Sequence, residues 1–105
     1  MKKTAIILGS DSDLPIAEKC IDVLRKLGLQ FTVHVISAHR TPEQARDFAL
    51  TAQANDYGVI IAVAGKAAHL AGVLASHTRL PVACMVIDGG ANVAWLAART
   101  VKVNS

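Results

Sequence analysis

Cysteine and aromatic residues are scarce in this sequence: its 105 residues include two cysteines, and aromatic residues make up 4%. Cys20 and Cys84 lie far apart in the sequence and follow no metal-ligand spacing. Cys20 falls on an apolar helical stripe and Cys84 within an apolar run, so we expect both to be buried thiols of a cytoplasmic protein. The four histidines lack ligand spacing and acidic partners, and no metal site is predicted.

Charge is also sparse, at 18% of residues with a net charge of +3. The basic residues are scattered without interleaved aromatics, which argues against a nucleic-acid partner. No apolar run is long enough to span a membrane, and the run after Lys2 and Lys3 is too short for a signal peptide. The hydrophobic fraction of 52% is high for one domain of this length. We therefore expect a single domain, 1–105, that covers some apolar surface in a homo-oligomer.

Short apolar runs alternate with helical patterns along the chain. Strands are expected at 4–8, 31–36, 59–63 and 81–87, and helices at 13–27, 42–55, 67–77 and 91–101. The second strand alternates apolar and polar residues, which suits an edge strand with His34 on the wetter face, whereas the run 59–63 suits a central strand. Ala94, Trp95 and Ala98 are expected to face inward. Short links between four βα units predict an α/β fold: a flavodoxin-like, three-layer αβα structure with a parallel sheet of order 2-1-3-4.

Three turns meet at the switch point of such a sheet, between the first and third strands. They are residues 9–13, 37–42 and 64–69, and all contain small, hydroxylated or ionisable residues. Ligands bind at this place in open α/β sheets. In the second turn, His39 and Arg40 stand where a strand ends and a helix begins. Thr41 is the expected N-cap, with Gln44 as return partner of a capping box, so the turn places a proton-transfer group beside a fixed cation.

The sequences Gly-Ser-Asp-Ser-Asp (9–13), Ser-Ala-His-Arg-Thr-Pro (37–42) and Ala-Gly-Lys-Ala-Ala-His-Leu (64–70) resemble the signature turns of a purine-biosynthesis family. That family is the catalytic subunit of phosphoribosylaminoimidazole carboxylase, whose bacterial form is N5-carboxyaminoimidazole ribonucleotide mutase. Residues 88–92 resemble its later Gly-Ala-Asn turn. The resemblance implies an enzyme that moves a carboxylate from a ring nitrogen to a ring carbon of a ribonucleotide, without cofactor or metal, and that assembles as an octamer.

The resemblance also implies roles for individual residues. Ser10, Asp13 and Arg40 match residues that bind the ribonucleotide, and His39 matches the general acid/base. From the residues alone, Asp13 is equally well explained as a helix N-cap, and both roles are compatible. Candidate pocket-lining residues complete the expected site: Gly9, Ser12, Ser37, Gly65, Lys66, Ala67 and His69.

Departures from the family pattern bear on function. Lys66 stands where a glycine is usual, and after Val82 the chain runs directly into residues 83–88, as though one βα unit and its loop had been removed. The resemblance also leads us to expect a C-terminal extension, for which the sequence shows no counterpart up to Ser105. Two functions therefore stay open: the enzyme described above, or a catalytically impaired flavodoxin-like scaffold that binds a nucleotide phosphate or assembles with itself.

Overall fold

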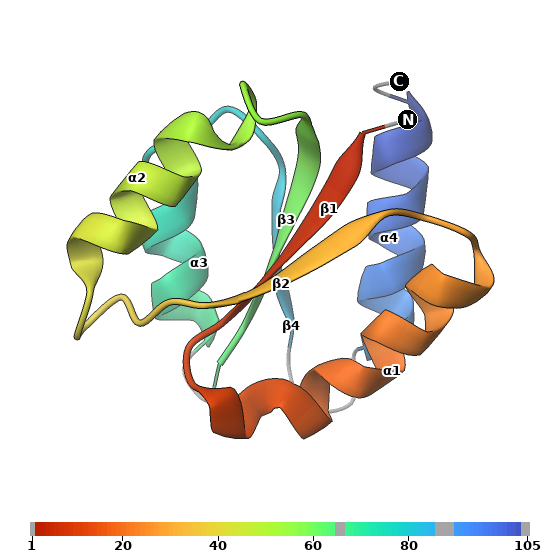
Figure 1. Ribbon diagram of the computed structural model, residues 1–105, viewed down its shortest axis with the longest axis horizontal. Coiled ribbons are helices and arrows are strands. Elements are labelled where there is room, and N and C mark those ends of the chain that lie inside the picture. The colour runs from red at the N-terminus through yellow and green to blue at the C-terminus, as the bar shows by residue number, and fades with distance from the viewer. Residues whose placement is uncertain (1, 65–66, 86–89, 104–105) are drawn as a thin grey trace.

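The computed structural model describes residues 2–64, 67–85 and 90–103, and these form one parallel four-stranded sheet with helices on both faces (Figure 1). The strands are β1 (Lys3–Leu8), β2 (Phe31–Val35), β3 (Tyr57–Val63) and β4 (Val82–Met85). The helices are α1 (Leu14–Lys26), α2 (Pro42–Ala52), α3 (Ala67–Ala75) and α4 (Gly90–Val103), and a short 3₁₀ turn, η1 (Asp11–Asp13), precedes α1.

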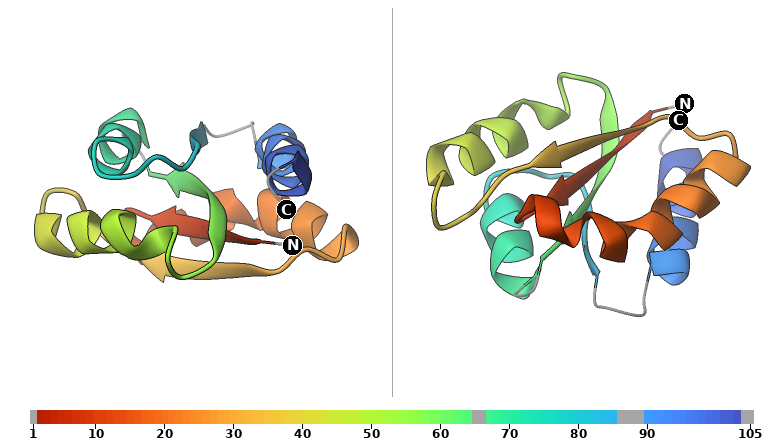
Figure 2. Two further views of the ribbon diagram at one scale, coloured as in Figure 1. Left: turned by 90° about the horizontal axis from the view of Figure 1, so that it is seen from above. Right: turned by 60° about the horizontal axis from the view of Figure 1, so that its bottom comes forward.

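The strand order is β2-β1-β3-β4, and every neighbouring pair is parallel. The predicted flavodoxin-like order is confirmed. Helices α1 and α4 cover one face of the sheet and α2 and α3 the other, as the two views of Figure 2 show. Because the chain passes from β1 outward to β2 and then back past β1 to β3, the turns that follow these strands meet at one edge of the sheet.

The core forms where the expected apolar patterns place it. All seven residues of β3 are buried, as a central strand covered on both faces requires. Alanines line the inner faces of the helices: Ala45, Ala49 and Ala52 on α2, and Ala94, Ala97 and Ala98 on α4. The inward placement predicted for Ala94 and Ala98 is confirmed, whereas the side chain of Trp95 lies outside those described.

Several boundaries differ from the predicted ones. Helix α2 ends at Ala52, and the chain then turns through Asp56, whose φ of 71° is in the left-handed region. Helix α3 ends at Ala75, and β4 is described as far as Met85. The 3₁₀ turn η1 was not predicted. It belongs to the functional site, because it sets the shape of the turn after β1.

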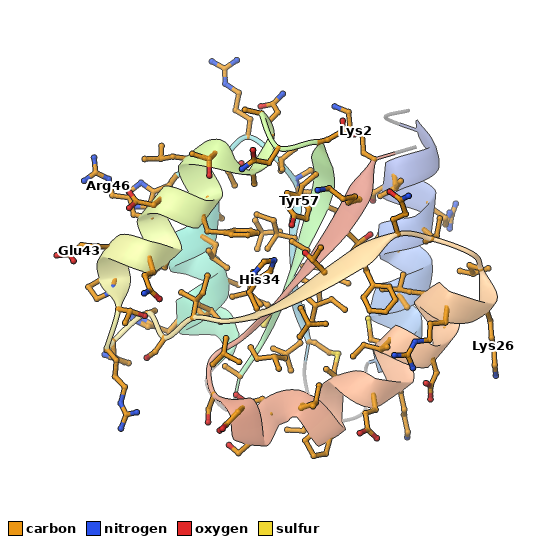
Figure 3. The ribbon with its side chains drawn as sticks, viewed as in Figure 1. Lys2, Lys26, His34, Glu43, Arg46 and Tyr57 are labelled. Carbon is orange, nitrogen blue, oxygen red and sulfur yellow. The ribbon has the colours of Figure 1, made fainter. Side chains whose placement is uncertain are left out.

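The prediction that His34 lies on the wetter face of β2 is wrong. Val33 and Val35 are the exposed residues, at 39% and 53%, while His34 is half-buried. His34 Nε2 lies 2.8 Å from Thr32 Oγ1, and its ring lies against Phe48 of α2. Figure 3 shows His34 on the side of β2 that faces α2. Helix α2 and the ring of Tyr57 cover this face, so the polar residues of β2 lie inside and the valines outside.

The prediction that both cysteines are buried holds for Cys20 alone. Cys20 belongs to α1 and is fully buried, and burial raises the pKa of its thiol to about 11. Cys84 is exposed. It belongs to β4, which among the described residues is an edge strand with β3 as its neighbour. An apolar strand at an edge leaves part of its surface to solvent, which explains the exposure of this thiol.

Candidate functional site

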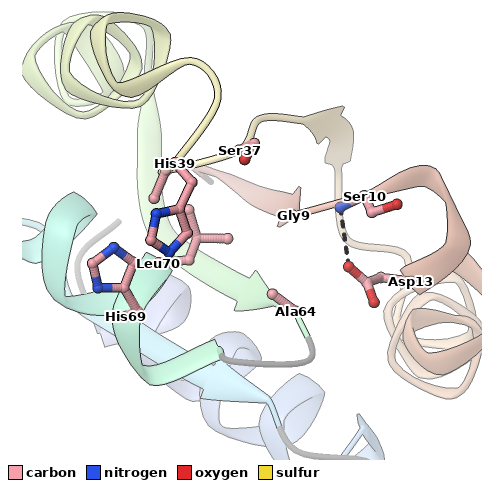
Figure 4. A pocket seen from close by; sticks show the side chains of 9 residues that line it. Gly9, Ser10, Asp13, Ser37, His39, Ala64, His69 and Leu70 are labelled. Carbon is pink, nitrogen blue, oxygen red and sulfur yellow. Dashed lines mark hydrogen bonds between the residues drawn. The ribbon is translucent and has the colours of Figure 1, made fainter.

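The three turns expected at the switch point surround one hollow at the carboxyl ends of β1 and β3 (Figure 4). Its volume is about 260 Å³. Each turn contributes three of the residues that line it: Gly9, Ser10 and Asp13 from the first, Ser37, Ala38 and His39 from the second, and Ala64, His69 and Leu70 from the third. Residues far apart in the sequence thus face the same space.

Gly9 allows the first and third turns to approach each other. A Cβ placed on Gly9 would lie 2.8 Å from Cβ of Ala64, which is closer than two carbon atoms tolerate. The N–H of Gly9 also donates to the carbonyl of Val63, at 2.9 Å. A glycine at this position therefore sets the width of the hollow at its base.

Asp13 holds the first turn closed. Its carboxylate Oδ2 accepts a hydrogen bond from the N–H of Ser10, at 3.0 Å, and the residue is only 9% exposed. With Ser10 as N-cap, this pair forms a capping box around η1. Asp13 was expected to cap the helix α1, but its side chain makes no hydrogen bond to that helix. The carboxylate instead closes the turn next to the hollow, which it also lines.

The hydroxyl groups of the first turn form a chain of contacts. Ser10 Oγ lies 3.0 Å from Ser12 Oγ and accepts a hydrogen bond from the N–H of Ser12, at 3.3 Å. The N–H groups of Ser10, Ser12 and Asp13 already have partners within the turn. Ser10 is half-buried and lines the hollow, and its hydroxyl is already in contact with Asp11 and Ser12. Ser12 is exposed and does not line the hollow.

Thr41 and Ser37 close the second turn. The hydroxyl of Thr41 accepts from the N–H of Ser37, at 3.2 Å, and donates to the Ser37 carbonyl, at 3.0 Å. Thr41 stands at the N-cap position of α2 with Pro42 following, as predicted, but its side chain does not cap the helix. The predicted capping box with Gln44 is therefore wrong. The Thr41 hydroxyl bonds to the main chain of Ser37 and not to the N–H groups of α2, because Ser37 is within reach on the same tight turn.

His39 stacks directly on His69, and both residues line the first hollow. The two ring centroids are 4.7 Å apart and the ring planes are inclined by 15°. Figure 4 shows the two imidazoles side by side, one from the second turn and one from α3. Both residues are exposed, so a ligand in the hollow has direct access to them. His69 is thereby placed in contact with the residue expected to transfer protons.

Arg40 faces a second hollow, of about 390 Å³, on the other side of the same turn. This second hollow shares Gly9, Ser10 and Ser37 with the first. The residues of its remaining lining are Asp11, Val35, Arg40, Thr41 and Gln44. The consecutive residues His39 and Arg40 thus line two adjoining hollows. The hydroxyl-bearing residues Ser10 and Ser37 line both hollows.

The structure brings together most of the residues expected at the site. His39, Asp13 and His69 line the first hollow, and Arg40 the second, while Ser10, Gly9 and Ser37 line both. Gly65, Lys66 and the side chain of Ala67 lie outside the described residues. Ala38, Ala64 and Leu70 were missed as site residues. They belong to the recognised turns, and their apolar side chains carried no chemical signal by which to single them out.

Metal-ligand clusters and membrane-spanning helices are both absent among the described residues. Within 2–64, 67–85 and 90–103, no three His, Cys, Asp or Glu side chains gather closely enough to hold a metal ion. None of the helices described in the structure is long and apolar enough to cross a membrane. The polar groups that line the two hollows are hydroxyls, the carboxylates of Asp11 and Asp13, two imidazoles, the amide of Gln44 and a guanidinium.

Comparison with models of protein families shows to which family this chain is related. The family model of AIR carboxylase matches residues 3–84, which include all three turns of the site. The chain belongs to the AIR carboxylase family. The matched segment ends within β4, so α4 lies beyond it.

Curated proteins from several organisms are similar to most of this chain. N5-carboxyaminoimidazole ribonucleotide mutase of Pyrococcus abyssi is 51% identical over 82 residues, which cover 78% of this chain and 47% of that protein. The mutase of Methanocaldococcus jannaschii is 49% identical over 83 residues, covering 79% of this chain and 51% of the other. The chain spans about half the length of the curated relatives it matches.

Solved structures support the fold over nearly the whole chain. The crystal structure of Treponema denticola PurE superposes with a TM-score of 0.81 at 22% identity, covering 98% of this chain and 82% of the other. A second crystal structure, of a substituted form of Treponema denticola PurE2, gives a TM-score of 0.80 at 25% identity, covering 100% of this chain and 83% of that one. The similarity of fold therefore extends past β4 to α4, which the family model does not reach.

Proposed function

We propose that this protein acts in purine biosynthesis. It would move the carboxylate of N5-carboxyaminoimidazole ribonucleotide from the nitrogen that carries it to the adjacent ring carbon. The observation that carries this proposal is the common hollow: His39 faces the same space as the Ser10–Asp13 turn. The family match and the mutase name of the curated relatives support the choice of reaction.

The two adjoining hollows fit the two ends of a ribonucleotide. A phosphate is a dianion, and a guanidinium binds it through two parallel hydrogen bonds. Arg40, with Ser10 and Ser37 at its side, would hold the phosphate in the second hollow. The imidazole ring of the substrate would then lie in the first hollow, below His39 and beside Asp13. With the second hollow, the site reaches the size of small-molecule pockets, about 300–1,000 Å³.

His39 would supply both proton transfers of the reaction. Cleavage of the N–carboxylate bond releases the carboxyl carbon as CO2 and requires a proton on the nitrogen. Attack of the ring carbon on CO2 then forms the new C–C bond, and removal of the proton from that carbon restores the aromatic ring. Imidazole titrates near neutral pH, so one side chain can donate the first proton and accept the second.

The first hollow needs further cover for this chemistry. His39 and His69 are both exposed, and a reaction that passes through CO2 benefits from exclusion of water. A second copy of the chain placed over the hollow would provide that cover. The proposal therefore includes a homo-oligomer, which the family resemblance would make an octamer, working in the cytoplasm on a small-molecule substrate. The alternative is a protein that binds the ribonucleotide and does not turn it over.

Absorbance spectroscopy with a matched variant separates these two functions. The aminoimidazole ribonucleotide and bicarbonate are mixed with the purified protein, with His39→Asn beside it, while calorimetry measures binding of the same ribonucleotide. An absorbance change that His39→Asn abolishes, with binding retained, supports the enzyme. Binding without any absorbance change would support the scaffold and contradict the enzyme.

A further inference from the structure

Thr41 bonds to Ser37 where a cap of helix α2 is expected, and we call these Thr41–Ser37 hydrogen bonds the clamp. Its position at the start of α2 would allow its hydroxyl to bond the free N–H groups of the first helical turn. The hydroxyl instead makes two hydrogen bonds to the main chain of Ser37, one to the N–H and one to the carbonyl. The main-chain N–H of Thr41 donates to the same carbonyl, at 2.9 Å. The helix is therefore left without a side-chain cap in favour of the turn.

The clamp encloses the two residues expected to work on the substrate. The chain leaves Ser37, passes through Ala38, His39 and Arg40, and is tied back to Ser37 by Thr41. A further bond runs inside the loop, from the N–H of Arg40 to Oγ of Ser37, at 3.1 Å. These contacts hold the main chain on both sides of His39 and Arg40, which are both exposed.

The clamp also anchors this loop to the core. The carbonyl of Thr41 accepts the first hydrogen bond of α2, from the N–H of Ala45, at 3.2 Å. Ala45 is completely buried against the sheet, so the helix beyond the clamp is fixed in place. A rotation of the loop would have to break the contacts to Ser37 before it could move His39 relative to His69.

We propose that Thr41 is a positioning residue for the reaction: its hydroxyl sets the direction of His39 into the first hollow and of Arg40 into the second. This inference rests on the proposed function for its effect on catalysis, but the placement of His39 can be measured without turnover. Displacement of a reacting group by about 1 Å costs about a hundredfold in rate. Loss of a clamp that governs both His39 and Arg40 should therefore affect kcat and KM together.

The test compares Thr41→Val, which keeps the shape and removes both hydroxyl bonds, with Thr41→Ser, which keeps the hydroxyl. Thr51→Val is the matched control, because Thr51 also donates to a main-chain carbonyl of α2, that of Asp47 at 2.8 Å, but on an exposed part of the helix that lines neither hollow. Thr41→Ala replaces Thr41→Val if the latter does not fold. The full chain is used throughout.

Two readouts are needed. The first is the NMR signals of the imidazole C–H groups of His39 and His69, which report the ring stack directly. The second is kcat and KM with the carboxyaminoimidazole ribonucleotide. We expect Thr41→Val to shift the His39 signals and to lower kcat/KM about tenfold or more, while Thr41→Ser and Thr51→Val stay near the unaltered protein.

Unchanged His39 signals in Thr41→Val, or equal losses in Thr41→Ser and Thr41→Val, would overturn the positioning role. An unaltered protein that lacks turnover would contradict the proposed function alone, because the NMR comparison still decides whether Thr41 orients His39.

Discussion

The imidazole of His39 lies against that of His69, with ring centroids 4.7 Å apart and planes inclined by only 15°. The two histidines come from different turns, so the stack joins the loop before α2 to the first turns of α3. It limits the rotation of His39 at the point where a substrate would meet it. We therefore expect His69 to act on the proposed chemistry first of all by restricting the ring of His39.

Substitution of His69 tests this role. We expect His69→Phe, which retains a flat ring, to keep more of the kcat than His69→Ala, which leaves the His39 ring free on one side. The measurement is steady-state kinetics with the carboxyaminoimidazole ribonucleotide, and an effect of about tenfold between the two variants is expected. Equal losses in both would show that His69 acts through its nitrogen atoms and not through the stack.

The close approach of Gly9 to Ala64 makes a prediction about stability. Gly9→Ala adds a methyl group 2.8 Å from Cβ of Ala64, so the two turns must separate. We expect a loss of about 1–3 kcal/mol in the free energy of unfolding, as overpacked sites show. Ala64→Gly removes the opposing methyl group and should restore much of this loss in the double variant, as measured by chemical denaturation. Additive effects of the two changes would contradict the contact.

The two cysteines should differ strongly in reactivity. Cys20 is fully buried with a pKa of about 11, so at pH 8 only about one thiol in a thousand is the reactive thiolate. Cys84 is exposed. We expect a coloured disulfide reagent to react with one thiol in the folded protein, and Cys84→Ser to abolish that reaction. Two thiols reacting at the same rate without denaturant would contradict the placement of Cys20.

His34 predicts a dependence of stability on pH. Burial first, and then the charge of Lys3, lower the pKa of His34 in the folded protein. The unfolded chain therefore takes up the proton at a higher pH than the folded one, and protonation favours unfolding. The contribution of His34 is complete above the unfolded pKa of about 6.5 and is lost as the pH falls from there to the lowered pKa.

Two variants check this dependence. His34→Gln should flatten the curve of unfolding free energy against pH in that window, and Lys3→Met should narrow the window, because one cause of the lowered pKa is removed. The measurement is denaturant unfolding at a series of pH values. A wild-type curve parallel to that of His34→Gln across the window would contradict the burial of this imidazole.

The sheet order and the meeting of the three turns could be predicted because short βα links leave few topologies open. Which face of β2 is covered could not be predicted in the same way. Alternation separates Val33 and Val35 from His34, but it does not say which side faces the core. That depends on Tyr57 and Phe48, which arrive from later parts of the chain.

The turn before α2 shows the same limit at short range. Its pattern correctly predicted Thr41 at the N-cap position and Pro42 after it. The hydroxyl of Thr41 had two possible sets of partners, the helix and Ser37, and sequence spacing does not rank them. The exposure of Cys84 likewise depends on the position of β4 in the sheet, at its edge, and the apolar character of the strand does not reveal that position.

The most direct test of the proposed function follows the carboxylate itself. The substrate carries ¹³C in the carboxylate on nitrogen, unlabelled bicarbonate is present in excess, and ¹³C NMR records where the label goes. Transfer of the ¹³C to the ring carbon by the unaltered protein, and not by His39→Asn, is the result we predict for a mutase. Product that carries only unlabelled carboxylate would indicate a carboxylase that takes free CO2. A label that stays on nitrogen or escapes as bicarbonate at the same rate in both proteins would contradict catalysis by His39.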